Sequence, residues 1–294
     1  MSSPNVDPLS VKQEQKAAWD AISVGWEAIE EVFERGGATA TQRLLELGGV
    51  RPGHRVLDIA TGRGEPALTA ARVVGPGGKV VGTDISPGML AGARRRATEA
   101  GLANVELVAC DLEEAVLPAH SFDVALSRCG LMFAVDHVAA FRSIARLLIP
   151  GGVLAAAVWG PPADVPFLST GYAVLAERLQ LPEPPPGTPG PFSMSDPGRL
   201  ASSLAEAGFC DISVTGLLVP FELDTAEEYA DFNRAVSPPK LLALVRDRFG
   251  STEDPPTWQA IAAAAGKYAT DGSGRLSMPS LALCVRAVAP PFSS

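Results

Sequence analysis

A predicted apolar strand with one acidic residue runs into a glycine-containing turn in residues 56–65, whose sequence is VLDIATGRGE. A strand, a turn with glycines and a helix start are also the layout of a dinucleotide site, where a diphosphate binds at the helix N-terminus. Here Asp58 at the strand end and Glu65 at the helix start would place two carboxylates beside that anion. The charges therefore disfavour a nicotinamide dinucleotide. They favour a ligand with positive charge near the turn, and Gly62 and Gly64 allow it to approach the backbone closely.

Acidic residues also follow the next two predicted strands. Asp84 ends the segment 80–84, VVGTD, and lies 20 residues past Gly64, while Asp111 follows the strand 105–109. Two more segments continue the pattern: FDVALS at 122–127 is a fourth strand, and LIPGG at 148–152 is the turn before a fifth. Open α/β sheets bind their ligands at the carboxyl ends of the strands, and the two insertions described below are candidates for a cap over that edge.

The order and spacing of these five segments resemble the motifs of the class I S-adenosylmethionine-dependent methyltransferases. The likeness is closest to the quinone-methylating and related small-molecule methyltransferases; it covers residues 40–160, and more weakly continues through 223. It departs from the family pattern at Ala60, where many members have glycine. The resemblance implies S-adenosylmethionine as the cofactor, a nucleoside whose ammonium and sulfonium supply the positive charge that the turn favours.

The resemblance also implies roles for individual residues. Asp58 would act through the turn and the donor's ammonium, Asp84 would accept from both ribose hydroxyls, and Asp111 would accept from the adenine amine. The other residues that we expect at the donor are Ala60, Thr61, Gly62, Gly64, Ile85, Met89, Cys110, Leu112, Ser127 and Arg128, with Trp19 and Trp26 from an N-terminal lid.

Structural alternatives stand beside these assignments. Turns use glycine and aspartate without binding anything, and the alternative role of Asp111 is a helix N-cap. Arg128 would form only an ion pair, and the stripe that contains Trp19 and Trp26 would simply pack on the sheet domain.

His137 is the best placed of the three histidines for a general base, because it follows Asp136 at a helix start on the acceptor side. A histidine at a helix start is more often solvated than catalytic. Methyl transfer to an acidic carbon or a phenol needs little beyond proximity, so the use of a base stays open.

The elements that position these residues follow from hydrophobic spacing. The large apolar residues of 19–33 fall on one helical face, and a second helix is expected at 40–47, ending at Gly48 and Gly49. Further helices are expected at 88–100, 138–148 and 196–207, and strands at 55–60, 80–83, 105–109, 122–127, 153–159, 212–223 and 281–288. Alternating strands and helices predict an α/β fold: a doubly wound, Rossmann-like, mostly parallel seven-stranded sheet with an N-terminal helical lid and an inserted helical cap.

Domain boundaries follow from shifts in composition. The segment 182–191 holds six prolines in ten residues, which excludes regular structure there. We expect residues 1–50 to form the lid, residues 51–160, 192–223 and 279–290 the sheet domain, and residues 161–191 and 224–278 the insertions that bind the acceptor.

Composition limits the partners. A net charge of −9 and a pI near 4.9 disfavour nucleic acid and anionic membranes, and no apolar run reaches the roughly 18 residues of a membrane span. Four cysteines without close spacing indicate reduced thiols, no metal site and a cytoplasmic location.

The sequence thus predicts in-line methyl transfer to a small, largely apolar acceptor, by C- or O-methylation in secondary or quinone-like metabolism. The alternative is a protein that binds S-adenosylmethionine as a scaffold for a non-methylating reaction. The acceptor itself, N-methylation, and the choice between monomer and homodimer stay open.

Overall fold

A mostly parallel sheet forms the centre of the computed structural model, which describes residues 7–185, 187–270, 272 and 274–291. Within these residues seven strands form one sheet in the order β3-β2-β1-β4-β5-β9-β6. The parallel strands are β1 (Arg55–Ile59), β2 (Lys79–Asp84), β3 (Val105–Ala109), β4 (Phe122–Arg128) and β5 (Leu148–Trp159), and β9 (Ser280–Val288) runs antiparallel between β5 and β6 (Cys210–Val219). The predicted fold class is confirmed.

Both faces of the sheet are covered, so its strands alternate between two buried sides. Val124 and Leu126 of β4 belong to one core cluster with Leu44 of α1 (Pro8–Gly48), and this cluster also includes residues of α2 (Ala67–Val74). Ala125, between them, belongs to the other cluster with Phe141 of α4 (His137–Leu147) and residues of α6 (Pro197–Glu206). A further helix, α3 (Pro87–Glu99), follows β2 and packs against β2 and β3.

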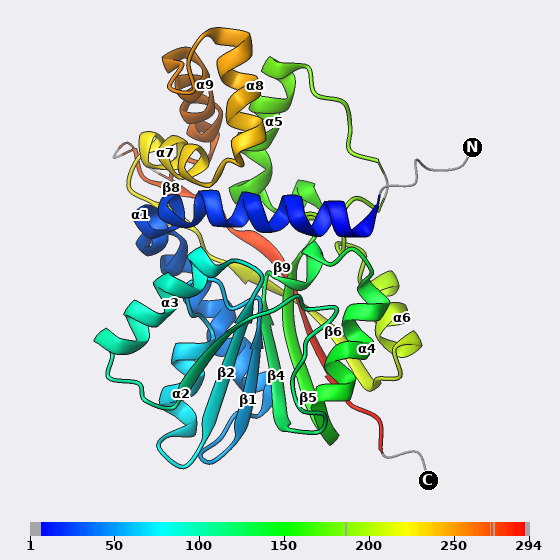
Figure 1. Ribbon diagram of the computed structural model, residues 1–294. Coiled ribbons are helices and arrows are strands. Elements are labelled where there is room, and N and C mark those ends of the chain that lie inside the picture. Colours follow the sequence, from blue (N-terminus) through cyan, green and yellow to red (C-terminus); the bar gives the residue numbers. More distant parts are fainter. Residues whose placement is uncertain (1–6, 186, 271, 273, 292–294) are drawn as a thin grey trace, which may run out of the picture.

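The N-terminal region is one helix, α1, where the sequence predicted two helices at 19–33 and 40–47. The prediction was wrong because Gly36 and Gly37 provide close packing rather than a break. A Cβ on Gly36 would lie 2.9 Å from the Phe221 ring, and one on Gly37 would lie 3.0 Å from an Arg128 nitrogen. The first half of α1 crosses above the sheet and the second half turns down behind it (Figure 1).

The predicted insertions contain helices that gather beyond α1, on the side away from the body of the sheet (Figure 1). They are α5 (Pro166–Leu179), α7 (Ala226–Val236), α8 (Pro239–Phe249) and α9 (Pro255–Ala265), and we call them the cap helices. A two-stranded sheet of β7 (Glu222–Leu223) and β8 (Leu276–Ser277) lies at their base. Residues 1–6 of the predicted lid and residues 186, 271 and 273 of the predicted insertions lie outside the described residues.

Two strand boundaries differ from the prediction for local reasons. The strand expected at 212–223 ends at Val219, because Pro220 has no N–H to donate to the ladder. The strand expected at 153–159 begins at Leu148, and Gly151, at φ +78°, lies in an irregular register where the predicted turn falls. No helix of the described residues is long and apolar enough to cross a membrane.

Candidate donor-binding site

The turn after β1 adopts a left-handed backbone that leaves open space beside it. Ala60, Gly62 and Gly64 have φ values of +53°, +55° and +110°. The turn is fixed to the neighbouring strand because the Thr61 N–H donates to the Thr83 carbonyl at 2.8 Å. A Cβ on Gly62 would meet no atom within 4 Å, so a ligand can approach the backbone there.

Asp58 is fully buried at the end of β1 and keeps one oxygen without a partner. Its Oδ2 accepts hydrogen bonds from the Thr61 hydroxyl at 2.5 Å and from the Ala67 N–H at 2.9 Å. Its Oδ1 is buried with no hydrogen-bond partner, and burial raises the pKa of the carboxyl to about 7. An orphaned carboxylate oxygen beside an open turn fits a cationic group of a ligand, such as an ammonium.

Asp84 links the end of β2 to the same turn. Its Oδ2 accepts from the Gly62 N–H and its Oδ1 accepts from the Ser86 N–H, each at 2.9 Å. Burial raises the pKa of Asp84 to about 6, and the neighbouring carboxylate of Asp20 adds to this effect. Asp84 therefore positions the turn from β2, and each of its oxygens retains a lone pair that can accept from a ligand hydroxyl.

Asp111 does not cap a helix, since the segment between β3 and β4 contains none. Its Oδ1 accepts from the Glu113 N–H at 2.8 Å, which makes a short turn. Its Oδ2 lies 2.8 Å from the ammonium of Lys12, which also pairs with Glu113 at 3.0 Å. The Asp111 carboxylate, which is predicted to contact the adenine, is therefore held in place by an ion pair with Lys12 of α1.

Residues 12–30 of α1 contact the loops after β3, β4, β2 and β1 in turn. Besides Lys12 at the loop after β3, the contacts are Gln15 to the Phe133 carbonyl at 3.0 Å, the Trp19 ring edge-on to Phe133 at 5.0 Å, Asp20 to Ser86 and to the Gly88 N–H, and Glu30 to Arg63 at 3.1 Å. Phe133 ends the short helix η1 (Leu131–Phe133), and Arg63 lies inside the glycine turn. Every predicted donor loop is therefore in contact with this helix.

Ser127 and Arg128 at the end of β4 are bound within the protein. The Ser127 hydroxyl donates to the Ile59 carbonyl at 2.9 Å, which ties β4 to β1. The Arg128 guanidinium donates to both carboxylate oxygens of Glu34 and to the Thr41 hydroxyl, and its side chain is 8% exposed. Arg128 thus forms the ion pair that the sequence left as its alternative role, and it anchors α1 to the sheet.

Replacing Glu34 with glutamine is expected to lower the free energy of unfolding by about 2 kcal/mol, because the buried guanidinium loses its counter-charge. Urea denaturation measures this. The control is Glu253→Gln, which removes one of the two carboxylates that pair with Arg234 at an exposed site and should change stability by less than ~1 kcal/mol. Equal effects of the two variants would contradict an anchoring role for Arg128.

The remaining predicted donor contacts surround the same loops. Ile85 and Leu112 are half-buried, Met89 is buried in the first turn of α3, and the Cys110 N–H donates to the Asp84 carbonyl at 3.0 Å. Trp26 packs edge-on against Phe33 at 5.1 Å. Their contact with a donor stays a prediction.

His137 begins α4, and its Nε2 lies 3.4 Å from the Ser193 hydroxyl. Burial lowers the pKa of its ring, so the imidazole is neutral at pH 7. No hydrogen bond or ion pair of the described residues joins it to Asp58, Asp84 or Asp111, and its role as a base stays a prediction. No group of three potential metal ligands occurs among the described side chains.

Ala60 holds a conformation in which a Cβ is strained, so Ala60→Gly is expected to raise the free energy of unfolding by about 1 kcal/mol. Ala125→Gly in the buried interior of β4 is the matched control and should have the opposite sign. Thermal denaturation of both variants checks this; destabilisation by both would show that the turn carries no strain at Ala60.

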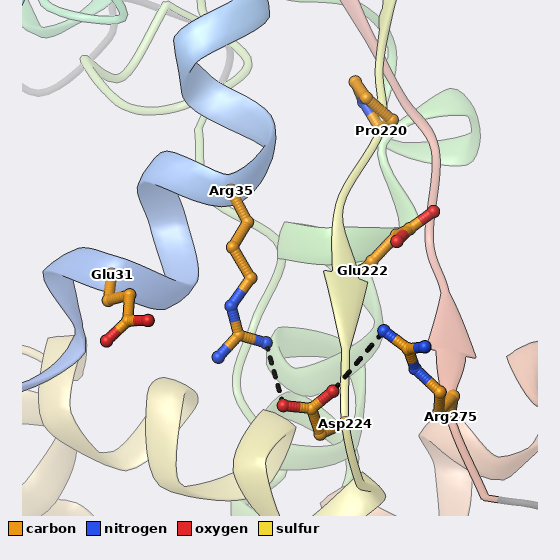
Figure 2. Close-up of a pocket in the computed structure, with 6 residues that line it drawn as sticks. All are labelled: Glu31, Arg35, Pro220, Glu222, Asp224 and Arg275. Carbon is orange, nitrogen blue, oxygen red and sulfur yellow. Dashed lines mark hydrogen bonds and ion pairs between the residues drawn. The ribbon is translucent and has the colours of Figure 1, made fainter.

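A separate pocket of about 560 Å³ lies between α1 and the β7–β8 sheet. It is lined by Glu31, Arg35, Pro220, Glu222, Asp224 and Arg275 (Figure 2). Asp224 pairs with Arg35 at 3.4 Å and with Arg275 at 3.6 Å across this pocket. These charges hold α1 to the base of the cap.

Comparison with known proteins agrees with this geometry. Residues 51–165 match the model of a methyltransferase domain family. The chain is 37% identical over 168 residues to the ubiquinone/menaquinone biosynthesis C-methyltransferase UbiE of Ectopseudomonas mendocina (strain ymp), which covers 56% of this chain and 65% of that relative. Residues 51–165 are therefore similar to a methyltransferase domain.

Two further matches extend this assignment. The aklanonic acid methyltransferase DauC of Streptomyces sp. (strain C5) is 42% identical over 114 residues, 39% of this chain and 52% of that one. The YcgJ protein of Bacillus subtilis shares the fold with a TM-score of 0.57 at 20% identity, over 86% of this chain and 99% of its own. The chain spans less than two thirds of the length of UbiE and about half of the length of DauC. The match to a methyltransferase domain agrees with the predicted cofactor, S-adenosylmethionine.

Sequence reasoning missed the residues of α1 that reach the donor loops. Lys12, Asp20 and Glu30 read as ordinary charges of a solvated helix face, and Arg63 as a variable turn residue. Their partners lie 33 to 102 positions away along the chain, so no local spacing could pair them.

Proposed function

We propose that the protein transfers the methyl group of S-adenosylmethionine in line to a small, largely apolar acceptor, by C- or O-methylation in secondary or quinone-like metabolism. The observation that carries the proposal is the buried, unpartnered oxygen of Asp58 beside the open turn at Gly62. The names of UbiE, a C-methyltransferase of quinone biosynthesis, and DauC, a methyltransferase of aklanonic acid, support this acceptor class.

The chain's own residues bind and orient. Asp58 would neutralise the donor's ammonium and Asp84 would accept from the ribose hydroxyls, while Asp111 would accept from the adenine amine. When bound, the cofactor supplies a methyl carbon already activated by its sulfonium. Positioning alone can then lower the barrier by roughly 7–11 kcal/mol, so the transfer needs no covalent intermediate on the protein.

Residues 12–30 of α1 would act as the lid of this site, because they contact all four donor loops. A lid that excludes water strengthens the charge interactions beneath it. We further propose that the acceptor is a free molecule rather than nucleic acid, since the net charge is −9. The four unpaired thiols, Cys110, Cys129, Cys210 and Cys284, support a reducing cytoplasmic location.

Incubation with methyl-labelled S-adenosylmethionine and a panel of hydroquinones, phenols and β-keto acids tests the proposal. Labelled product with an equal amount of S-adenosylhomocysteine supports it. Tight donor binding with no transfer to any member of the panel would instead favour the scaffold alternative, in which the cofactor is not consumed.

A further inference from the structure

Trp26 carries a buried polar atom that has no partner. Its indole Nε1 is buried without a hydrogen-bond acceptor, although the residue as a whole is only partly buried. The N–H of a buried tryptophan usually has a partner, because a buried donor without one has lost its hydrogen bonds to water and gained none in return. By contrast, the N–H of Trp258 in α9 donates to the Thr252 carbonyl at 3.0 Å.

The place of Trp26 on α1 puts it between the donor loops and the cap. It follows Ser23 by three residues and precedes Glu30 by four, so all three share one side of the helix. Ser23 packs against Gly88, where an added Cβ would lie 2.7 Å from its hydroxyl, and Glu30 pairs with Arg63 of the glycine turn at 3.1 Å. Trp26 therefore lies on the side of α1 that contacts the loops after β1 and β2.

The surroundings of the Trp26 ring are aromatic. Phe33 of α1 lies edge-on at 5.1 Å, and Phe232 of α7 lies edge-on at 6.2 Å. Phe232 in turn contacts Phe167 of α5 at 4.5 Å, which extends the aromatic wall into the cap. Such a wall favours a flat aromatic ring through edge-to-face contacts, and within it the Trp26 N–H is a polar group that no protein acceptor satisfies.

We propose that Trp26 determines acceptor specificity, and that the acceptor is an aromatic ring bearing an oxygen to which the Trp26 indole N–H donates a hydrogen bond. This rests on the proposed methyl transfer, for which it names the recognising residue. A carbonyl or phenol oxygen satisfies the orphaned donor, whereas a hydrocarbon of the same shape leaves it unpaired. The acceptor site therefore discriminates by one hydrogen bond inside an apolar wall.

Equilibrium dialysis of 1-naphthol and naphthalene against protein loaded with S-adenosylhomocysteine tests the proposal. Wild type should bind 1-naphthol about tenfold more tightly than naphthalene. Trp26→Phe keeps an aromatic ring without the donor and should remove this difference by weakening 1-naphthol alone. Trp258→Phe, whose N–H has a backbone partner, is the matched control and should keep the difference.

Equal loss of both probes in Trp26→Phe, or no preference for 1-naphthol in wild type, would overturn the proposal. Should Trp26→Phe fold poorly, the indole N–H resonances of ¹⁵N-labelled wild type decide: 1-naphthol should shift one of them downfield and naphthalene should not, and no shift would overturn the proposal. Incubation with labelled donor separates the two hypotheses, because absence of methyl transfer to any acceptor would remove the proposed transfer, whereas the preference for 1-naphthol in dialysis does not depend on turnover.

Discussion

Asp84→Ala is expected to weaken the binding of S-adenosylmethionine at least about 100-fold. The carboxylate would accept two ribose hydroxyls, and hydrogen bonds to a charged group contribute about 1.5–3 kcal/mol each. It also fixes the Gly62 N–H at 2.9 Å, so the turn loses its tie to β2. Isothermal titration calorimetry measures the affinity, and Asp84→Asn, which keeps the shape, should still lose most of it.

Asp123→Asn is the matched control for Asp84→Asn. Asp123 is the second residue of β4. Its Oδ2 accepts a hydrogen bond from the N–H of Arg55, the first residue of β1, at 2.8 Å. It is therefore also a carboxylate bound to backbone, but it lies at the amino end of the parallel strands. Donor affinity in this variant should stay within about twofold of wild type; near-normal affinity in Asp84→Ala would show that the ribose site lies elsewhere.

Asp58→Asn is expected to stabilise the ligand-free protein while weakening donor binding more than about tenfold. The pKa of Asp58 is raised to about 7 in the folded protein by burial, against about 4 for an unfolded aspartate. Between these two values the folded state holds a proton that the unfolded state has released. The free energy of unfolding of wild type therefore falls as pH rises from about 4 to 7, and stays low above that.

Asparagine does not titrate, so the free energy of unfolding of the variant should not fall between pH 4 and 7 for this reason. Its side-chain oxygen can accept from Thr61 and Ala67 while its amide occupies the place of the orphaned oxygen. Melting temperatures of the two proteins should agree near pH 4 and diverge by at least ~3 °C in favour of the variant at pH 8. A lower melting temperature at pH 8 would show that Asp58 is stabilised as an anion by the fold itself.

The strand-end carboxylates were predictable because their geometry is local. A strand followed by a turn fixes where Asp58, Asp84 and Asp111 must emerge, and parallel pairing brings the strand ends to one edge. The strain at Ala60, with φ +53°, was also predictable in outline, since many relatives of that motif have glycine there.

The lid contacts were not predictable from local patterns. The path of α1 depends on Gly36 and Gly37, which look like a helix end but serve close packing against Phe221 and Arg128. Its polar contacts depend on that path, so Lys12 reaches Asp111 only because the helix crosses the whole sheet edge. The orphaned N–H of Trp26 is a property of three-dimensional surroundings that no spacing in the sequence reveals.

Titration of the wild-type protein with S-adenosylmethionine, and separately with NAD, tests the central claim most directly. The account predicts saturable binding of S-adenosylmethionine that strengthens from pH 6 to 8 as Asp58 ionises, with no measurable heat from NAD. Absence of S-adenosylmethionine binding at pH 8, or preferential binding of NAD, would contradict the assignment of the three strand-end carboxylates to a cationic nucleoside.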